Sequence, residues 1–183
     1  MGTELALGVA TAAAAAVFLC AGLGKLAVPG PAARAIAELL EFGPRPAGVL
    51  VRATGVLEAA TGVALVVPAT RPVGVPAAGV LGAGFILLGV VARMQRVSAS
   101  CGCFGSAQGH PFGLRNAVYG AALLAVAVVD TLVPYPAHPA QPALPLALTA
   151  AGCVCLSAWL HRALIISVLG PLARPSTPEG VGA

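Results

Sequence analysis

Two cysteines separated by a single glycine, Cys101 and Cys103, are the residues of this sequence best suited to chemistry. They lie in the polar stretch "SASCGCFGSAQGH", residues 98–110, where small and polar neighbours leave both sulfur atoms open to water or to a partner protein. Gly102 tolerates the backbone angles that a disulfide between residues i and i+2 needs, and we expect the small ring to be strained. Because a strained disulfide exchanges readily, the pair is suited to passing electrons and not to holding a fold together.

Basic side chains and a histidine lie near the two cysteines along the chain: Arg93, Arg96, His110 and Arg115. A nearby positive charge favours the thiolate, which is the attacking species in disulfide exchange. Metal binding is an alternative, in which Cys101, Cys103 and His110 would hold a soft ion such as Cu(I). A third interpretation is a non-catalytic assembly scaffold, in which the segment docks a partner and the thiols take no part.

Three further cysteines lie in apolar stretches. Cys20 is near the end of the first stretch, where it is either a third thiol that resolves the pair or a small packing residue. Cys153 and Cys155 repeat the C-x-C spacing, but residues i and i+2 of a helix are about 200° apart and do not face each other. We therefore interpret Cys153 and Cys155 as packing residues.

The composition is that of a membrane protein. Of 183 residues, 58% are hydrophobic and 9% are charged, whereas a soluble domain carries about 25% charged residues. The net charge of +4 comes without a run of Lys or Arg or interleaved aromatic residues, which argues against nucleic acid as a partner. The sequence predicts an all-α, multi-pass bundle of four to five transmembrane helices in the cell membrane, with the lipid bilayer as its surroundings.

Five apolar stretches are long enough to be spans, and they cover about residues 5–24, 47–67, 73–92, 116–133 and 144–169. Residues 29–46, bounded by prolines, predict a short amphipathic helix at the interface. His161 and Arg162 interrupt the fifth stretch, so four spans plus a re-entrant piece is the competing count. We assign residues 1–170 to one transmembrane domain and 171–183 to a disordered tail.

The basic residues divide unequally between the two ends of a five-span bundle. One end collects eight of them: Lys25, Arg34, Arg45, Arg93, Arg96, Arg115, Arg162 and Arg174. The other end holds Arg71 alone. The positive-inside rule then puts the N-terminus outside and the C-G-C segment on the cytoplasmic face, where thiols are generally kept reduced.

Glu58, near the middle of the second predicted span, is expected to face the bundle interior because a charge at that depth is costly in lipid. Arg52 is six residues earlier and does not align with it, so Lys25 and Arg115 are equally acceptable partners. Two roles stay open for Glu58, namely a structural ion pair and a proton or quinone site, in which Glu58 and Arg115 would contact the quinone. Asp130 is expected to be solvated at the interface.

Four stretches of the sequence occur in an order typical of one family: "AGLGKLAVPGP", "GVLEAATGVALVV", "CGCFGS" and "LRNAVYGAALL". With them, roughly residues 10–133 resemble the MauE family of methylamine-utilisation membrane proteins, related to the DoxX-like group. The resemblance implies a helper in the maturation of the methylamine dehydrogenase β-subunit, a disulfide-rich periplasmic enzyme, alongside a thioredoxin-like partner. By that resemblance, Cys101 and Cys103 would pass electrons to or from this partner. A periplasmic substrate requires either that electrons cross the membrane or that the number of spans differs from five.

Overall fold

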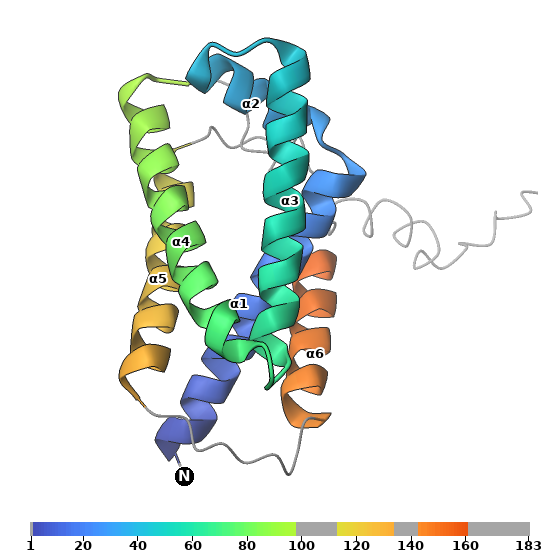
Figure 1. The fold of residues 1–183 in the computed structure, drawn as a ribbon, viewed down its shortest axis with the longest axis vertical. Coiled ribbons are helices and arrows are strands. Elements are labelled where there is room, and N and C mark those ends of the chain that lie inside the picture. Colours follow the sequence, from blue (N-terminus) through green and yellow to red (C-terminus); the bar gives the residue numbers. More distant parts are fainter. Residues whose placement is uncertain (1, 98–112, 134–142, 161–183) are drawn as a thin grey trace, which may run out of the picture.

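The computed structural model describes residues 2–97, 113–133 and 143–160, and every regular element in these stretches is a helix (Figure 1). The helices are α1 (Gly2–Ala27), α2 (Gly30–Leu40), α3 (Pro44–Val66), α4 (Arg71–Met94), α5 (Leu114–Leu132) and α6 (Ala143–Leu160). The all-α bundle predicted from composition is therefore confirmed. The predicted short helix between the first two spans is α2, which begins with the prolines that the sequence places there.

Four of the described helices are long and apolar enough to cross a membrane: Ala6–Ala27, Pro44–Val66, Arg71–Met94 and Leu114–Leu132. They correspond to the first four predicted spans, with boundaries that differ by three residues or fewer. In α6 the apolar stretch that the structure describes, Ala147–Leu156, is shorter than a span. The predicted end of the fifth span at residue 169 and the predicted tail lie outside the described residues.

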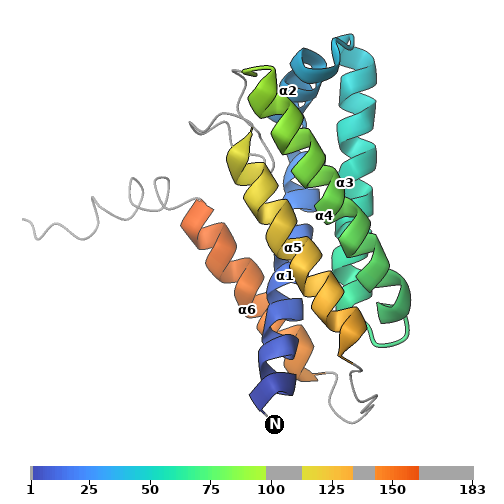
Figure 2. The same ribbon diagram turned by 90° about the vertical axis from the view of Figure 1, so that its left-hand side faces the viewer.

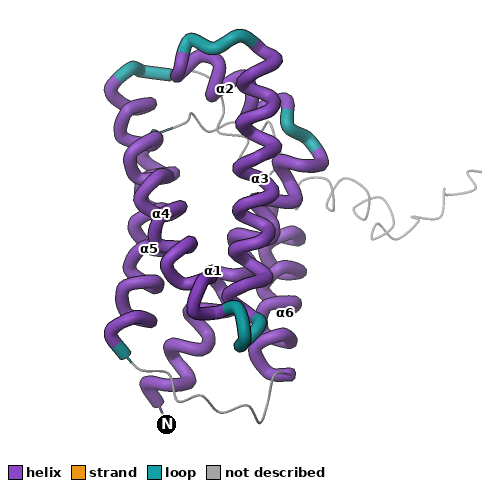
Figure 3. Tube along the Cα trace, in the orientation of Figure 1, coloured by secondary structure: helices purple, strands orange, loops and turns teal. Residues whose placement is uncertain are grey.

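The long helices run alternately up and down, and α2 lies across one end of them (Figure 1). Figure 2 shows α6 on the outside of the bundle, beside α1. The connections between the first four helices are short, as the tube in Figure 3 shows. Helices α1 and α4 run in the same direction, so their C-terminal ends lie at the same end of the molecule. The short helix α2 and the N-terminal ends of α3 and α5 lie at this end as well.

This end, called the basic end below, carries six described basic residues: Lys25, Arg34, Arg45, Arg93, Arg96 and Arg115. Arg71 begins α4 at the opposite end. The partition of charge between the two ends therefore agrees with the sequence-based prediction for the described residues, while Arg162 and Arg174 lie outside them. The segment with the two closely spaced cysteines leaves α4 and enters α5 at the basic end.

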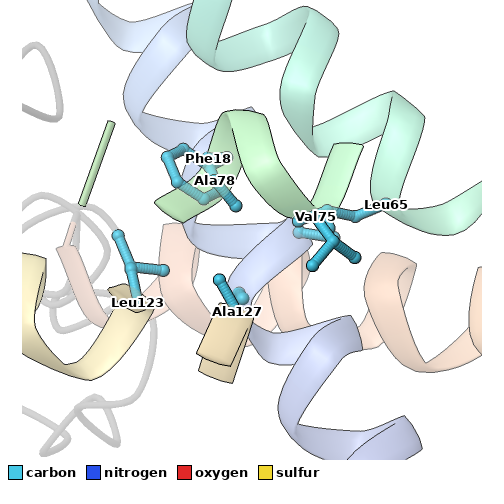
Figure 4. Close-up of a cluster of buried hydrophobic side chains, with 8 residues drawn as sticks. Phe18, Leu65, Val75, Ala78, Leu123 and Ala127 are labelled. Carbon is cyan, nitrogen blue, oxygen red and sulfur yellow. The ribbon is translucent and has the colours of Figure 1, made fainter. Parts of the chain in front are cut away.

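The core combines small and medium apolar side chains with the larger ring of Phe18, and its members come from four helices (Figure 4). Its buried members are Ala14, Ala15 and Phe18 of α1, Leu65 of α3, Val75 and Ala78 of α4, and Leu123 and Ala127 of α5. A second, smaller cluster joins Leu39 of α2 to Ala92 and Val97 at the basic end. Leu39 therefore ties α2 to the end of α4, while most contacts of α2 with other helices are with α3.

Glycine allows α4 and α5 to approach until their backbones touch. A Cβ atom on Gly82 would lie 2.9 Å from the carbonyl oxygen of Gly120, and one on Gly120 would lie 2.6 Å from that of Gly82. Gly84 on the same helix does not take part in this approach, because a Cβ atom there would have no described neighbour within 4 Å.

Candidate functional site

The C-G-C motif and His110 lie between Val97 and Gly113, outside the described residues. The helices that hold this segment are described. Val97 is buried in the cluster that it forms with Leu39 and Ala92. At the other end of the segment, a Cβ atom on Gly89 of α4 would lie 2.8 Å from the carbonyl oxygen of Gly113, at the start of α5. The two ends of the segment are therefore held on a closely packed helix pair.

A buried ion pair lies inside the bundle between α1 and α3. The Lys25 ammonium donates to both carboxylate oxygens of Glu58, with Nζ 2.8 Å from Oε1 and 2.6 Å from Oε2. The side chains are 7% and 1% exposed. The prediction that Glu58 faces the bundle interior is confirmed, and Lys25 is the partner among the three candidates.

Two glycines position this ion pair, each three residues before one of its members. A Cβ atom on Gly22 would lie 2.6 Å from the amide nitrogen of Ala59, and one on Gly55 would lie 3.2 Å from Cβ of Lys25. Residues three apart lie on the same face of a helix. The spacing Gly-x-x-Lys on α1 and Gly-x-x-Glu on α3 therefore brings the two backbones together where the ion pair forms.

A third helix contributes an aromatic ring to the ion pair. The Lys25 ammonium nitrogen lies 5.6 Å from the centroid of the Phe85 ring of α4, within the distance at which a cation is attracted to a ring face. Lys25 thus ties α1 to α3 by charge and to α4 through the ring. Since both oxygens of Glu58 accept from Lys25, the carboxylate is committed to this ion pair.

The other two basic candidates do not take part in this ion pair. Arg52 is exposed on α3, and Arg115 is exposed in the first turn of α5. Arg93 and Arg96 are exposed as well, so three exposed arginines flank the C-G-C segment along the chain. None of these positions tests whether Glu58 and Arg115 contact a quinone, and those contacts stay a prediction.

A second ion pair joins α4 to α5 at the end of the bundle opposite to the basic end. The Arg71 guanidinium donates from both Nε and Nη2 to the Asp130 carboxylate, with Nε 3.3 Å from Oδ2. The side chains are 20% and 3% exposed. The expectation that Asp130 is solvated is wrong, because its carboxylate lies against α4, where an arginine forms the first residue.

The cysteines of the described helices fall into two environments. Cys20 of α1 and Cys153 of α6 are half-buried and adjacent, with the Cys20 sulfur 3.8 Å from the carbonyl oxygen of Cys153. Cys155 is exposed on the other side of α6. The expectation that Cys153 and Cys155 do not face each other agrees with this arrangement, whereas the closeness of Cys20 and Cys153 was not anticipated.

Sequence reasoning named Lys25 as one of the acceptable partners of Glu58 but missed the pairing of Arg71 with Asp130, although the sequence holds a signal for each ion pair. The glycines three residues before Lys25 and Glu58 mark where α1 and α3 approach. Arg71 and Asp130 both lie toward the end of the predicted bundle opposite to the basic end, where Arg71 is the one basic residue of the predicted turns, and opposite charges there are expected to pair. No comparable signal exists for Cys20 and Cys153, because the position of α6 on α1 cannot be read from its apolar pattern.

One of three comparisons with known proteins identifies a family for this chain. The model of one family, methylamine utilisation protein MauE, matches residues 3–132, which is more than half of the 183 residues. The match covers α1 to α5 together with the C-G-C segment, and it leaves out α6. No curated protein and no solved structure matches the chain significantly. The chain belongs to the MauE family of methylamine utilisation proteins.

Proposed function

We propose that this membrane protein is a thiol–disulfide exchange helper in methylamine utilisation, with Cys101 and Cys103 as its working pair. Family membership carries the proposal, because the matched residues 3–132 include both cysteines and the family is described by methylamine utilisation. The partner is a thioredoxin-like protein, and the process served is maturation of the methylamine dehydrogenase β-subunit.

The chemistry is a two-electron exchange between dithiol and disulfide. A thiolate of one cysteine attacks a sulfur of the partner's disulfide, which forms a mixed disulfide and releases one partner thiolate. The second cysteine then attacks the mixed disulfide, so that a Cys101–Cys103 disulfide forms and the partner leaves as a dithiol. The reverse sequence oxidises the partner, and the relative reduction potentials set the direction.

The surroundings of the segment support this chemistry. Arg93, Arg96 and Arg115 are exposed and flank the two cysteines along the chain, and positive charge favours the attacking thiolate. The helices at the two ends of the segment, α4 and α5, pack closely on each other through Gly82, Gly89 and Gly120.

The decisive experiment traps the mixed disulfide. In cells that express the full chain with Cys103→Ser, an attack by Cys101 cannot be resolved, so the thioredoxin-like partner should stay covalently attached until a reductant is added. The Cys155→Ser variant is the control, because Cys155 is an exposed thiol on α6 and should not affect the exchange. Full maturation activity in both single variants, Cys101→Ser and Cys103→Ser, would instead support a scaffold, and copper bound to the reduced protein would support metal handling.

The side of the membrane is tested in the same cells. Labelling of Cys101 and Cys103 by a membrane-impermeant thiol reagent in intact cells would show direct exchange with an extracytoplasmic partner. Labelling only after the membrane is opened would show that the segment faces the cytoplasm, as the positive-inside rule predicts, and that electrons for a periplasmic substrate must cross the membrane.

A further inference from the structure

Two thiols from helices far apart in the sequence meet at the contact between α1 and α6. The Cys20 sulfur lies 3.8 Å from the backbone oxygen of Cys153, and the Cys153 sulfur lies 3.9 Å from the backbone oxygen of Ala16, one turn before Cys20. Each sulfur thus reaches the backbone of the opposite helix.

Small residues allow this approach. A Cβ atom on Gly152 would lie 3.0 Å from Cβ of Ala16, so α6 lies directly on α1 beside the two thiols. A disulfide requires Cα atoms within roughly 4.4–6.8 Å and Cβ atoms pointing toward each other. The reciprocal sulfur-to-backbone contacts show that each thiol is directed at the opposite helix, and the close packing at Gly152 favours a short separation between the two helices.

The surroundings of the thiol pair are those of a membrane interior. Cys20 lies within the span Ala6–Ala27, and Cys153 lies in the apolar stretch Ala147–Leu156. On the outer side of α6, Val154 is 69% exposed, which places lipid next to this helix. A water-soluble protein disulfide does not enter the hydrocarbon layer, whereas a lipid-soluble oxidant does.

An unsatisfied hydroxyl lies one turn from Cys153. Thr149 is buried, and within the described part of the chain its Oγ1 has no hydrogen-bond partner. Positions i and i+4 share a helix face, so this hydroxyl is on the same side of α6 as the Cys153 thiol. A buried polar group without a partner requires an explanation, and a redox site that takes up and releases protons supplies one.

We propose that Cys20 and Cys153 are a second redox-active pair, which a lipid-soluble quinone oxidises to a disulfide that joins α6 covalently to α1. Both S–H bonds break and one S–S bond forms. The two electrons and two protons pass to the quinone, which becomes the quinol. The site goes beyond the proposed exchange at Cys101 and Cys103, and Cys153 lies outside the residues that match the family.

The test counts thiols in full-length chains that lack the C-G-C cysteines. The chain has five cysteines, so Cys101→Ser, Cys103→Ser and Cys155→Ser together leave Cys20 and Cys153. Membranes containing this variant are incubated with decylubiquinone, quenched with acid, dissolved in SDS and treated with a polyethylene-glycol maleimide that adds a countable mass to each thiol. Both thiols should become unreactive and both should return after dithiothreitol.

The matched control carries Cys153→Ser in place of Cys155→Ser, which leaves Cys20 and the exposed Cys155. This control should keep both reactive thiols under the same treatment. Retention of both thiols in the Cys20/Cys153 variant, an irreversible loss, or an equal loss in the control would overturn the proposal. Peptide mass spectrometry on the unsubstituted chain after quinone treatment gives a second measurement, in which a Cys20–Cys153 linked peptide is expected and its absence counts against the pair.

Discussion

Lys25 and Glu58 meet inside the bundle with both oxygens of the carboxylate accepting from a single ammonium nitrogen, at 2.8 and 2.6 Å. A charge in a membrane interior is retained where it is paired, and here the pair also connects three helices, because Lys25 lies over the ring of Phe85. The ion pair lies beside the close contacts of Gly22 and Gly55. The ion pair and the closest approach of α1 to α3 therefore lie at the same point of the bundle.

The first prediction concerns the energetic coupling between Lys25 and Glu58. Lys25→Met should lower the free energy of unfolding by roughly 3–5 kcal/mol, because it leaves a buried carboxylate without a partner. Glu58→Gln should also destabilise, and the double variant should lose less than the sum of the single losses. The measurement is the unfolding midpoint of the detergent-solubilised protein in SDS. Arg52→Met is the control on the exposed side of α3, and strictly additive single losses would contradict the pairing.

The second prediction concerns the backbone contact below the ion pair. In Gly22→Ala the new Cβ would lie 2.6 Å from both the Ala59 nitrogen and the Gly55 oxygen, which are backbone atoms that cannot rotate away. The helices α1 and α3 must separate, and we expect a loss of about 1–3 kcal/mol. Gly48→Ala on α3 is the control, because no described atom lies within 4 Å of its Cβ position, and alanine is the better helix former there by up to about 1 kcal/mol. Equal midpoints for the two variants would contradict the close approach.

The helices themselves could be predicted from the sequence because a span is set by length and hydropathy, which are local properties. The burial of Glu58 could also be predicted from the sequence. A carboxylate exposed to lipid is costly, so a span that carries one must turn it toward the interior of the bundle. Its partner could not, because Lys25 and Arg115 were equally acceptable until the packing of α1 against α3 was known. Asp130 was misjudged because its position near a helix end suggested water, while the first residue of α4 supplies a guanidinium there.

The thiol pair of α1 and α6 shows the limit of sequence reasoning more clearly. Cys20 and Cys153 are separated by 133 positions, and nothing local to either residue indicates the other. Apolar residues occur on every face of α6, so its sequence does not say which side packs on α1. The C-G-C pair could be recognised because its chemistry is contained in three consecutive residues.

A third prediction compares the two members of the ion pair between α4 and α5. Arg71→Met leaves Asp130, whose side chain is 3% exposed, as a buried unpaired carboxylate. Asp130→Asn leaves an arginine that is 20% exposed and can extend its head group to water, and the amide oxygen still accepts a hydrogen bond. Arg71→Met should therefore be the more destabilising change, by about 1 kcal/mol or more. SDS unfolding midpoints of the two variants decide the order, and the reverse order would show that the carboxylate is solvated.

The last prediction uses two buried threonines that differ in one respect. Thr11 of α1 donates its hydroxyl to the carbonyl oxygen of Leu7 at 2.9 Å, whereas the Thr149 hydroxyl of α6 has no partner within the described residues. Valine replaces threonine with nearly the same shape, so only the hydroxyl is lost. Thr11→Val should destabilise by about 1 kcal/mol, because a hydrogen bond disappears, and Thr149→Val should be neutral or stabilising by a similar amount, because an unsatisfied polar group leaves the interior. The unfolding midpoint should fall for Thr11→Val and should stay the same or rise for Thr149→Val, and a loss at Thr149 as large as that at Thr11 would show that its hydroxyl is bonded in the folded state.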